Sequence, residues 1–523
     1  MDINSTPSKL GSRAFEAAVA LAVGIGAVAG SYAAVGARPS FLAAPVAAWV
    51  TALTPDAVVT WAILTLGSLG QSLGFVLALA LSVVGVGVVA AGSRALARST
   101  GADLLVTHAL TALAVGVVTL ALTAGPLSAL GAALGAGVVS LSTHHVGSPP
   151  ADTSPDRRGV RRAVAAAAAV TGASAFLGTR PSLADSAEGT AAGASGSDTT
   201  GGGDAGGADT VVDGLLAAAT ARTLDLPDLD PLVSRDFYRV DINSVDPDLS
   251  ADGWSLRLTG AVDREREFSY DQLTSLPAEH RFVTLQCVGD GLNGKKIDTA
   301  LWTGVPIAEL LPDLPDECCV MLRAADDYYE EFPLSALRNG FIAYRMNGQP
   351  LPRAHGHPVR ALIPGHWGEI NVKWLTEIEV LEEEVDGYWE KRGWHGTGPV
   401  NTVAKLHSVS RDGDSVRVGG HAYAGTRGIE RVEVSTDGGD SWAEATLSEP
   451  LPGAVDAQTG ESLREEAEDA WRMWEYTYDA TESHEVVVRA VDGTGTLQEE
   501  TEQRAFPRGP TGWVSQRVDP RRL

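Results

Sequence analysis

The chain has 523 residues, enough for about three domains, and only three cysteines, which excludes a disulfide-dense scaffold. Its net charge of −26 is uneven, because residues 1–182 carry a net charge of +4 and residues 183–523 carry −30. The acidic excess argues against nucleic-acid binding, which requires the opposite sign, and favours a surface suited to high salt.

Residues 1–182 predict a membrane domain, because they are rich in Ala, Val, Leu and Gly and almost free of charge between a few basic clusters. We predict five transmembrane helices, which lie near residues 14–35, within 57–92, and near 103–124, 127–146 and 163–178. The stretch 57–92 exceeds one span, so it predicts a tilted helix with an extension or a helix preceded by a re-entrant piece. Most basic residues of this domain fall on one side, which places the amino terminus in the cytoplasm and the chain after residue 178 outside the cell membrane.

Three histidines lie near the cytoplasmic ends of the third and fourth predicted spans: His108, His144 and His145. Polar groups in a membrane domain are candidates for function. They are either interfacial side chains or ligands of a b-type haem that passes electrons towards quinone. The haem is the less favoured of these two interpretations.

The rest of the chain predicts a linker and two further domains. Residues 183–212 are rich in Gly, Ala, Ser and Asp, which predicts a flexible linker. Residues 213–398 mix strand-like runs with helix signals and predict a mixed α+β catalytic domain. Residues 399–523 show short alternating strands between turns and predict a β-sandwich with a C-terminal tail. The expected fold is therefore an α-helical membrane bundle, a mixed α+β domain and a β-sandwich.

Cys287 is the leading candidate for a catalytic residue. It ends the apolar run Phe282–Gln286 and begins the turn Val-Gly-Asp-Gly, so a strand end presents its thiol to a loop. A thiolate in this place suits a soft metal, whereas most free cysteines are small buried hydrophobic residues. The other two cysteines, Cys318 and Cys319, predict core positions of a strand or, as the less favoured alternative, a redox pair.

A second candidate segment lies between residues 346 and 375. An Asn-Gly turn, prolines and four glycines indicate an ordered loop that carries three histidines and three cations. Such a loop suits a polyanionic ligand such as a phosphate. Zinc is a weaker alternative, because His355, His357 and His366 have no acid or cysteine at a familiar ligand spacing.

Residues 235–507 resemble the sulfite oxidase family of molybdopterin-dependent oxidoreductases. The resemblance rests on segments in the family order: Phe237–Arg239, Phe282–Gly291 with Leu301–Pro306, Ala324–Leu334, Met346–Leu375, Gly428–Trp442 and Ala470–Tyr476.

The resemblance implies a molybdenum–molybdopterin cofactor with Cys287 as the molybdenum ligand. It implies oxygen-atom transfer to a lone-pair donor such as sulfite, with Arg239 and Arg431 holding the anion. The implied cofactor-binding residues are Arg239, Cys287, Asp326, His355, Arg360, Asn371 and Lys373. The last domain resembles the immunoglobulin-like dimerisation domain of the family, which implies a homodimer.

Two positions depart from the family pattern. Trp394 stands where family members carry a tyrosine near the metal, and its indole can only donate a hydrogen bond. Asp290 falls in the segment Val-Gly-Asp where many relatives have Gly-Asn-Arg, so a basic residue of the substrate pocket is missing. Both departures leave the metal site in place and the substrate open.

The leading hypothesis is a membrane-anchored, sulfite oxidase-like enzyme that acts on a small oxyanion. A reductase of an S-oxide, an N-oxide or nitrate on the same fold is the first alternative, and a cofactor-free membrane-anchored binding module is the second. The sequence has no haem domain, flavin fingerprint or iron–sulfur cysteine set, which implies a separate electron acceptor, either a carrier protein or quinone.

Overall fold

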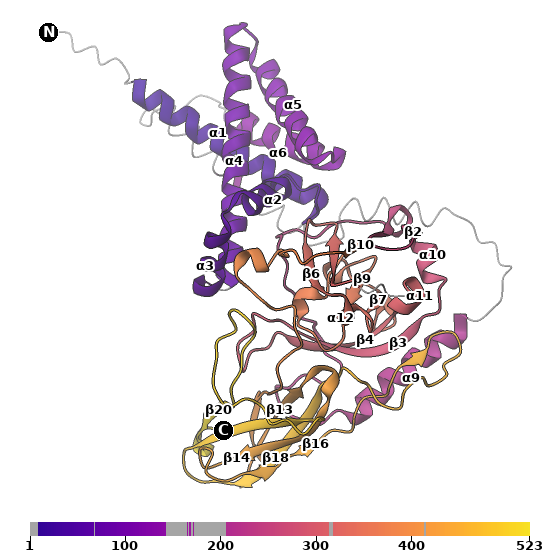
Figure 1. The fold of residues 1–523 in the computed structure, drawn as a ribbon. Coiled ribbons are helices and arrows are strands. Elements are labelled where there is room, and N and C mark those ends of the chain that lie inside the picture. Colours follow the sequence, from indigo (N-terminus) through magenta and orange to yellow (C-terminus); the bar gives the residue numbers. More distant parts are fainter. Residues whose placement is uncertain are drawn as a thin grey trace. The chain divides into compact units, whose positions relative to one another are not determined.

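The structure, a computed structural model, describes residues 9–66, 68–142, 165, 167–168, 171, 205–312, 317–412 and 415–523. The chain divides into two compact units, Met1–Gly201 with Ile242–Asp248, and Gly202–Asp241 with Leu249–Leu523. Among the described residues, the first unit is helical and the second carries the strands (Figure 1).

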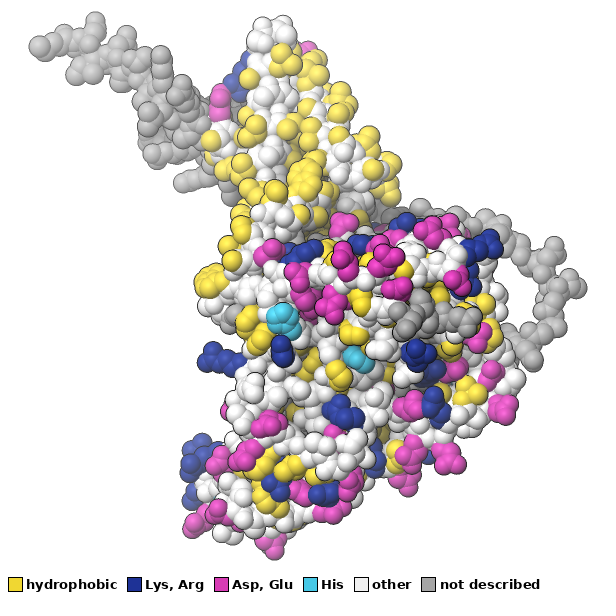
Figure 2. Space-filling view, viewed as in Figure 1, with side chains coloured by type: hydrophobic (Ala, Val, Ile, Leu, Met, Phe, Trp, Pro, Cys, Tyr) yellow, Lys and Arg dark blue, Asp and Glu magenta, His cyan; other side chains and the backbone are white. Residues whose placement is uncertain are grey.

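The helices of the first unit are α1 (Lys9–Val35), α2 (Ala43–Leu53), α3 (Asp56–Leu66), α4 (Ser68–Ser99), α5 (Leu104–Thr123) and α6 (Pro126–Ser142). Three segments are long and apolar enough to cross a membrane: Phe15–Val35, Ser72–Ser99 and Leu104–Thr123. Exposed leucines and valines, such as Val88 and Leu113, cover these helices, and Figure 2 shows hydrophobic side chains spread over the helical unit. These features are consistent with membrane anchoring.

The predicted spans correspond only in part to these helices. Predicted spans 14–35 and 103–124 coincide with α1 and α5, and 127–146 corresponds to α6, a shorter apolar helix. The stretch 57–92 is divided between α3 and α4, and α2 and α3 form a pair bent by 102° that is a broken span or a re-entrant loop. The described residues therefore contain three candidate spans, or up to four, and the fifth predicted span lies almost wholly outside them.

Glycines bring α1 and α6 into backbone contact. A Cβ atom on Gly30 of α1 would lie 2.2 Å from the carbonyl oxygen of Gly131 of α6, and one on Gly135 would lie 2.0 Å from that of Gly26. Small residues four apart on both helices are the usual means of close helix packing in membranes.

We expect Gly135→Ala to destabilise the helical unit by about 1–3 kcal/mol, the cost of overpacking, even though alanine has the higher helix propensity. Gly137→Ala on the same helix is the matched control, because its Cβ would meet Ala112 at an ordinary 3.7 Å. Thermal unfolding of the detergent-solubilised chain measures both. Equal stability of the two variants would contradict the close packing of α1 on α6.

The second unit begins with α9 (Ala205–Arg222). Residues 205–212 of the predicted linker thus lie in a helix. The physical reason is a stripe of apolar side chains, since Val212, Leu215 and Ala219 are buried at helical spacing. The glycine-rich composition of the preceding segment predicts a linker and gives no sign of this apolar stripe.

Two sheets form the first part of the second unit. The first has the order β2-β1-β10-β5-β6, with β1 parallel to β10 and the other pairs antiparallel. Its strands are β1 (Ser255–Gly260), β2 (Arg266–Ser269), β5 (Cys319–Ala324), β6 (Tyr329–Pro333) and β10 (Leu375–Leu381). The second sheet has the order β17-β3-β4-β7-β8, with β9 also paired to β7. Its strands are β3 (Glu279–Gln286), β4 (Ile297–Pro306), β7 (Phe341–Met346), β8 (Gln349–Pro350), β9 (Arg360–Leu362) and β17 (Val455–Asp456).

Short helices connect the strands of the second unit. They are α10 (Tyr270–Thr274), α11 (Ile307–Leu310) and α12 (Leu334–Leu337), and the 3₁₀ turns η1 (Ala251–Gly253), η2 (Arg353–His355), η3 (Gly368–Ile370), η4 (Glu390–Arg392), η5 (Gly425–Arg427) and η6 (Pro520–Arg522). Turns η2, η3 and η4 carry side chains of the candidate sites described below.

The C-terminal part is β-rich, as predicted. One antiparallel sheet contains β11 (Val403–Ala404), β12 (Ser408–Asp412), β13 (Ser415–Tyr423), β16 (Thr446–Leu447) and β18 (Arg472–Asp479). The other contains β14 (Ile429–Ser435), β15 (Ala443–Glu444), β19 (His484–Asp492) and β20 (Val514–Val518). Both sheets contribute to one hydrophobic core, which includes Val418, Val432, Trp474 and Val488. The immunoglobulin-like topology of this domain stays a prediction.

The vicinal cysteines occupy two different environments. Cys319 begins β5 and is buried, as expected for a strand core, whereas Cys318 precedes the strand and is exposed. A disulfide joins them.

Candidate active site

Cys287 follows directly after β3, whose last five residues are buried. Its backbone N–H donates to the carbonyl of Lys296 (3.0 Å), and its own carbonyl accepts from the N–H of Asp290 (3.1 Å), which closes a tight turn around the thiol. Burial raises the pKa of Cys287 to about 11. The side chain therefore becomes a thiolate only where a positively charged partner stabilises it.

Asp290 holds the Cys287 turn rather than lining an open pocket. Its Oδ2 accepts from Nζ of Lys405 (2.8 Å) and from the backbone N–H of Lys296 (3.2 Å). Lys405 is fully buried and also donates to the carbonyl of Gly294 (2.8 Å). The sequence offered one signal of this contact, because Lys405 is a lone charge in the apolar run Val403–Leu406.

Two aromatic side chains border the thiol. A Cβ atom on Gly289 would lie 3.5 Å from the indole of Trp394 and 3.8 Å from Sγ of Cys287. A Cβ atom on Gly368 would lie 2.7 Å from the hydroxyl of Tyr238 and 3.8 Å from Cα of Cys287. The indole approaches this turn with its ring carbon Cη2. Its buried N–H has no hydrogen-bond acceptor within the described part of the chain.

Arg360 is the buried cation of the site. Its guanidinium donates to the carbonyls of His355 (3.2 Å) and Asn371 (3.0 Å) and lies 5.2 Å from the ring centre of Trp302. Asn371 is itself buried and holds the loop, since its amide accepts from the N–H of Ile363 and donates to a carbonyl. These contacts fix Arg360 and leave its Nε buried without a partner among the described residues.

Asp241 joins two further cations. Its carboxylate pairs with Nε of Arg239 (2.6 Å) and with Nζ of Lys373, and its side chain is 3% exposed. Asp326 lies within electrostatic range of Lys373, and burial raises the pKa of Asp326 to about 6. Sequence reasoning missed Asp241, although it stands two residues after Arg239 in an extended segment.

His355 contributes no charge to this group. Burial, followed by the neighbouring cations Arg360 and Lys373, lowers the pKa of His355 to about 4, so its imidazole is neutral at ordinary pH. Its ring contacts Phe237 edge to face, with the ring centres 5.6 Å apart.

The segment Phe237–Asp241 links the two halves of the site. Phe237 contacts His355, Tyr238 lies beside Cys287, and Arg239 and Asp241 reach Lys373. The structure thus brings together the sequence-predicted residues, which are Arg239, Cys287, Asp326, His355, Arg360, Asn371, Lys373 and Trp394.

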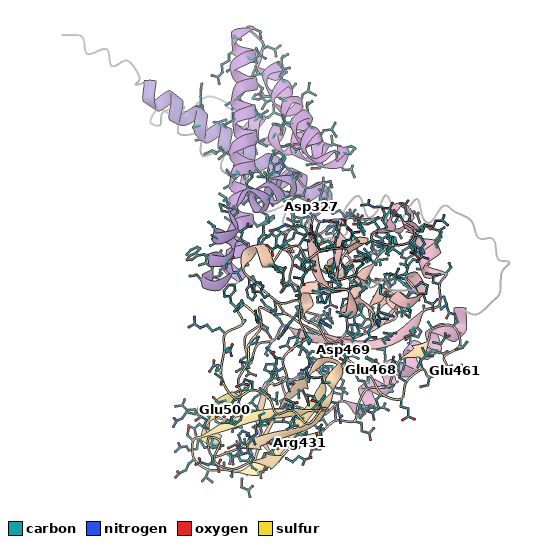
Figure 3. All side chains as sticks on the ribbon, viewed as in Figure 1. Asp327, Arg431, Glu461, Glu468, Asp469 and Glu500 are labelled. Atoms are coloured by element: carbon teal, nitrogen blue, oxygen red, sulfur yellow. A yellow bond between two sulfur atoms is a disulfide. The ribbon has the colours of Figure 1, made fainter. Side chains whose placement is uncertain are left out.

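Arg431 lies elsewhere. It stands on β14 of the C-terminal domain, where Figure 3 labels it, and pairs with Glu430 (2.8 Å) and Glu433 (2.9 Å). Two carboxylates on its own strand bind the guanidinium, and none of the contacts described for it reaches the Cys287 cluster. The role of Arg431 as an anion-holding residue therefore stays a prediction without structural support.

The candidate haem histidines fall in the first unit. Nδ1 of His108 on α5 lies 2.7 Å from Oγ of Ser140 on α6, which also accepts from Arg94 (2.8 Å). His144 and His145 lie outside the described residues. The haem stays a prediction.

Comparison with known families and proteins identifies the second unit. The sequence model described as "Oxidoreductase molybdopterin binding domain" matches residues 243–389, and that described as "Mo-co oxidoreductase dimerisation domain" matches residues 399–507. The chain belongs to the sulfite oxidase family of molybdenum oxidoreductases. The first of these domains supports a molybdenum–molybdopterin cofactor.

Individual members of the sulfite oxidase family are similar to about half of the chain. Mitochondrial sulfite oxidase of Homo sapiens is 30% identical over 310 residues, which cover 49% of this chain and 55% of that protein. Sulfite oxidase of Arabidopsis thaliana is 28% identical over 305 residues, 47% of this chain and 77% of that protein. Nitrate reductase [NADH] 2 of Nicotiana tabacum is 26% identical over 318 residues, 48% of this chain and 34% of that protein. The chain thus spans about half the length of its mammalian relatives.

The residues of this site fit the family cofactor. The cations Arg239, Arg360 and Lys373 outnumber the carboxylates Asp241 and Asp326, and the buried Nε of Arg360 still lacks a partner among the described residues. Gly356 lies against both Arg360 and Lys373, because a Cβ there would be 3.0 Å from Cβ of Arg360 and 3.2 Å from Cα of Lys373. A cationic cradle of this kind suits a phosphate, and the thiol of Cys287 suits a soft metal.

Proposed function

We propose that this chain is a membrane-anchored molybdopterin-dependent oxidoreductase that transfers an oxygen atom to a small oxyanion such as sulfite. One observation carries the proposal: the half-buried thiol directly after β3 shares a site with three cations, and a single short segment, Phe237–Asp241, joins it to them.

Each residue has a distinct role in this proposal. Cys287 ligates molybdenum, and Arg360, Lys373, His355 and Asn371 hold the pterin and its phosphate. When bound, the cofactor supplies the oxygen-atom transfer and takes up two electrons.

Arg239 recruits the anion. Its side chain is 43% exposed, which makes it the most accessible of the three cations. The net charge of −30 on residues 183–523 repels anions at long range, so a local cation at the entrance is needed.

A reductase of an S-oxide, an N-oxide or nitrate is the second candidate. Two observations favour it: Trp394 beside Cys287 has no hydroxyl, and the chain is also similar to a nitrate reductase. A cofactor-free binding module is disfavoured, because the buried Nε of Arg360 lacks a hydrogen-bond partner among the described residues and a bound anionic cofactor would supply one.

Assays in both directions separate these functions. We expect the purified chain to hold about one molybdenum atom and one pterin, and to reduce an artificial electron acceptor when sulfite is supplied. Turnover only with a reduced dye and an S-oxide, N-oxide or nitrate would favour the reductase. Protein without molybdenum, prepared from cells that load other molybdoenzymes, would overturn both.

The cellular setting belongs to the same proposal. Three helices apolar enough to span a membrane support an anchor in the cell membrane, and we place the catalytic domain outside the cytoplasm. A carrier protein or quinone then accepts the electrons, and the chain acts as a homodimer.

A further inference from the structure

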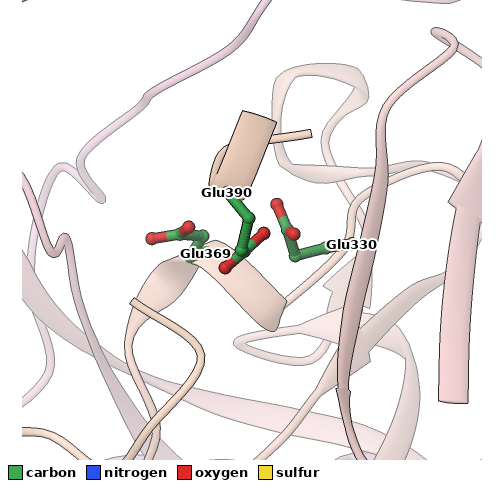
Figure 4. Close-up of side chains that lie close together, drawn as sticks. All are labelled: Glu330, Glu369 and Glu390. Atoms are coloured by element: carbon green, nitrogen blue, oxygen red, sulfur yellow. The ribbon is translucent and has the colours of Figure 1, made fainter. Parts of the chain in front are cut away.

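Three glutamates from different segments meet in the second unit, apart from the residues assigned to the cofactor. Glu330 comes from β6, Glu369 from η3 and Glu390 from η4 (Figure 4). Each offers a carboxylate oxygen, and these oxygens lie within 4.8 Å of one another. Glu330 is 0% exposed and Glu369 is 7% exposed, whereas Glu390 is half-buried.

Most of these oxygens have no protein donor. Oε2 of Glu330 accepts from the hydroxyl of Tyr328 (3.0 Å) and the N–H of Trp389 (3.2 Å). The other five carboxylate oxygens of the three residues are buried and have no hydrogen-bond partner of good geometry among the described residues, although the backbone N–H of Gly396 favours the charged form of Glu369. Burial, followed by neighbouring Glu390, raises the pKa of Glu330 well above its usual range, and the same two causes raise that of Glu369 to about 8.

The backbone is shaped around the carboxylates. A Cβ atom on Gly387 would lie 1.5 Å from Oε1 of Glu330, and one on Gly396 would lie 2.0 Å from Oε2 of Glu369. Glycine is therefore needed at both walls. The basic residues of η4 have other partners, since Lys391 donates to the hydroxyl of Tyr329 (2.8 Å) and Arg392 to the carbonyl of Tyr388 (2.6 Å).

We propose that Glu330, Glu369 and Glu390 bind a divalent cation, with Ca²⁺ favoured over Mg²⁺. Both are hard cations that take carboxylate oxygens. Ca²⁺ is favoured because it accepts mono- or bidentate carboxylates in flexible geometry, whereas Mg²⁺ needs a near-ideal octahedron and usually keeps several waters, which suits a largely buried group of carboxylates less well. A divalent ion also offers a partner to the orphaned oxygens, and it offsets two of the three negative charges that the carboxylates carry when all are ionised. A proton shared between Glu330 and Glu390 is the competing way to satisfy them.

The cation would connect three segments that border the Cys287 site. Residues 387–396 carry Trp394, and a Cβ on Gly396 would lie 2.9 Å from Val288, the neighbour of Cys287. None of its three ligands is among the residues assigned to the cofactor, and Glu369 acts on Cys287 only through its charge. Its role would be to position the segment that brings Trp394 to the thiol.

Terbium luminescence tests the site in the full-length, detergent-solubilised protein. Tb³⁺ replaces Ca²⁺ and emits when a nearby aromatic ring transfers energy to it, and Tyr328 and Trp389 donate hydrogen bonds to Glu330. In high salt, which weakens binding to exposed carboxylates, we expect one saturable emission signal that Ca²⁺ displaces better than Mg²⁺. Glu390→Gln should weaken Tb³⁺ binding by at least about tenfold, the lower end of the range for perturbing a metal site. Glu383→Gln, an exposed glutamate close by in the sequence, should bind as the wild type does.

Thermal unfolding provides a second readout. It tests the site even if Glu390→Gln fails to fold, because the wild type and Glu383→Gln are measured with and without the ion. With a chelator present, Glu390→Gln should be at least as stable as the wild type, since it removes one buried charge. With Ca²⁺ added, only the wild type and Glu383→Gln should gain several degrees in Tm. A wild type whose Tm does not respond to Ca²⁺, Mg²⁺ or Tb³⁺, or emission that Glu390→Gln leaves unchanged, overturns the proposal in favour of the shared proton.

Discussion

Cys287→Ser is expected to lower oxygen-atom-transfer activity by well over a hundredfold while the chain stays folded. Changes in residues that only support metal ligands cost about 10–100-fold, and Cys287 is proposed to be a ligand itself. Serine keeps the shape of the side chain but offers a hard hydroxyl in place of a soft thiolate. Molybdenum content, sulfite-dependent reduction of a dye and Tm, measured on the same preparation, test the prediction.

The vicinal cysteines supply the control for this variant. A Cys318→Ser/Cys319→Ser double variant replaces the other two cysteines of the chain, which a disulfide joins at the start of β5, and should keep wild-type molybdenum content and activity. If Cys287→Ser retained activity equal to this control, Cys287 could not be the ligand. If it lost activity but kept wild-type molybdenum content, a role other than binding the metal would explain the loss.

The sequence predicted the parts of the site that lie in continuous motifs. Cys287 marks the end of an apolar strand, and His355, Arg360, Asn371 and Lys373 stand within one loop of fewer than twenty residues. Local patterns suffice here because each strand or loop positions its own residues. The same is true of the β-rich C-terminal domain, where alternation and turns repeat at short intervals.

Local sequence patterns do not predict the long-range contacts that hold the site together. Lys405 reaches Asp290 across 115 positions, and Asp241 reaches Lys373 across 132. The packing of the sheets determines which residues form such pairs, and the local periodicity of the sequence carries no information about that packing. Asp290 shows the consequence. In the sequence it stands where many relatives have a basic residue of the substrate pocket, and in the structure its carboxylate forms an ion pair with Lys405.

The helical unit shows a different limit. Uniform apolar composition between residues 57 and 92 does not tell where α3 ends and α4 begins, because every position there is compatible with the membrane. Conversely, α9 begins inside a segment whose glycine content predicts a linker, and its buried stripe of Val212, Leu215 and Ala219 becomes evident only with its packing partners.

The second large effect is expected from Lys405→Met. Lys405 and Asp290 are 0% and 5% exposed at the side chain, and their charges lie 2.8 Å apart. Removing one partner of a buried ion pair leaves the other charge uncompensated and costs about 3–5 kcal/mol. We expect a loss of this size in the free energy of unfolding of the second unit, measured by urea denaturation. Lys295→Met, an exposed lysine of the same loop, should change it by less than about 0.5 kcal/mol.

A double variant tells whether the ion pair or the packing of Lys405 is responsible. Asp290→Asn/Lys405→Met removes both charges, so it should recover most of the stability that Lys405→Met loses. The carbonyl of Gly294 still loses its donor in the double variant, which leaves a smaller deficit. Because Asp290 also closes the turn that presents Cys287, the single variant should lose molybdenum more readily than the double variant. A double variant as unstable as Lys405→Met would mean that the lysine acts through its contacts with the backbone, and that Asp290 does not depend on it for charge.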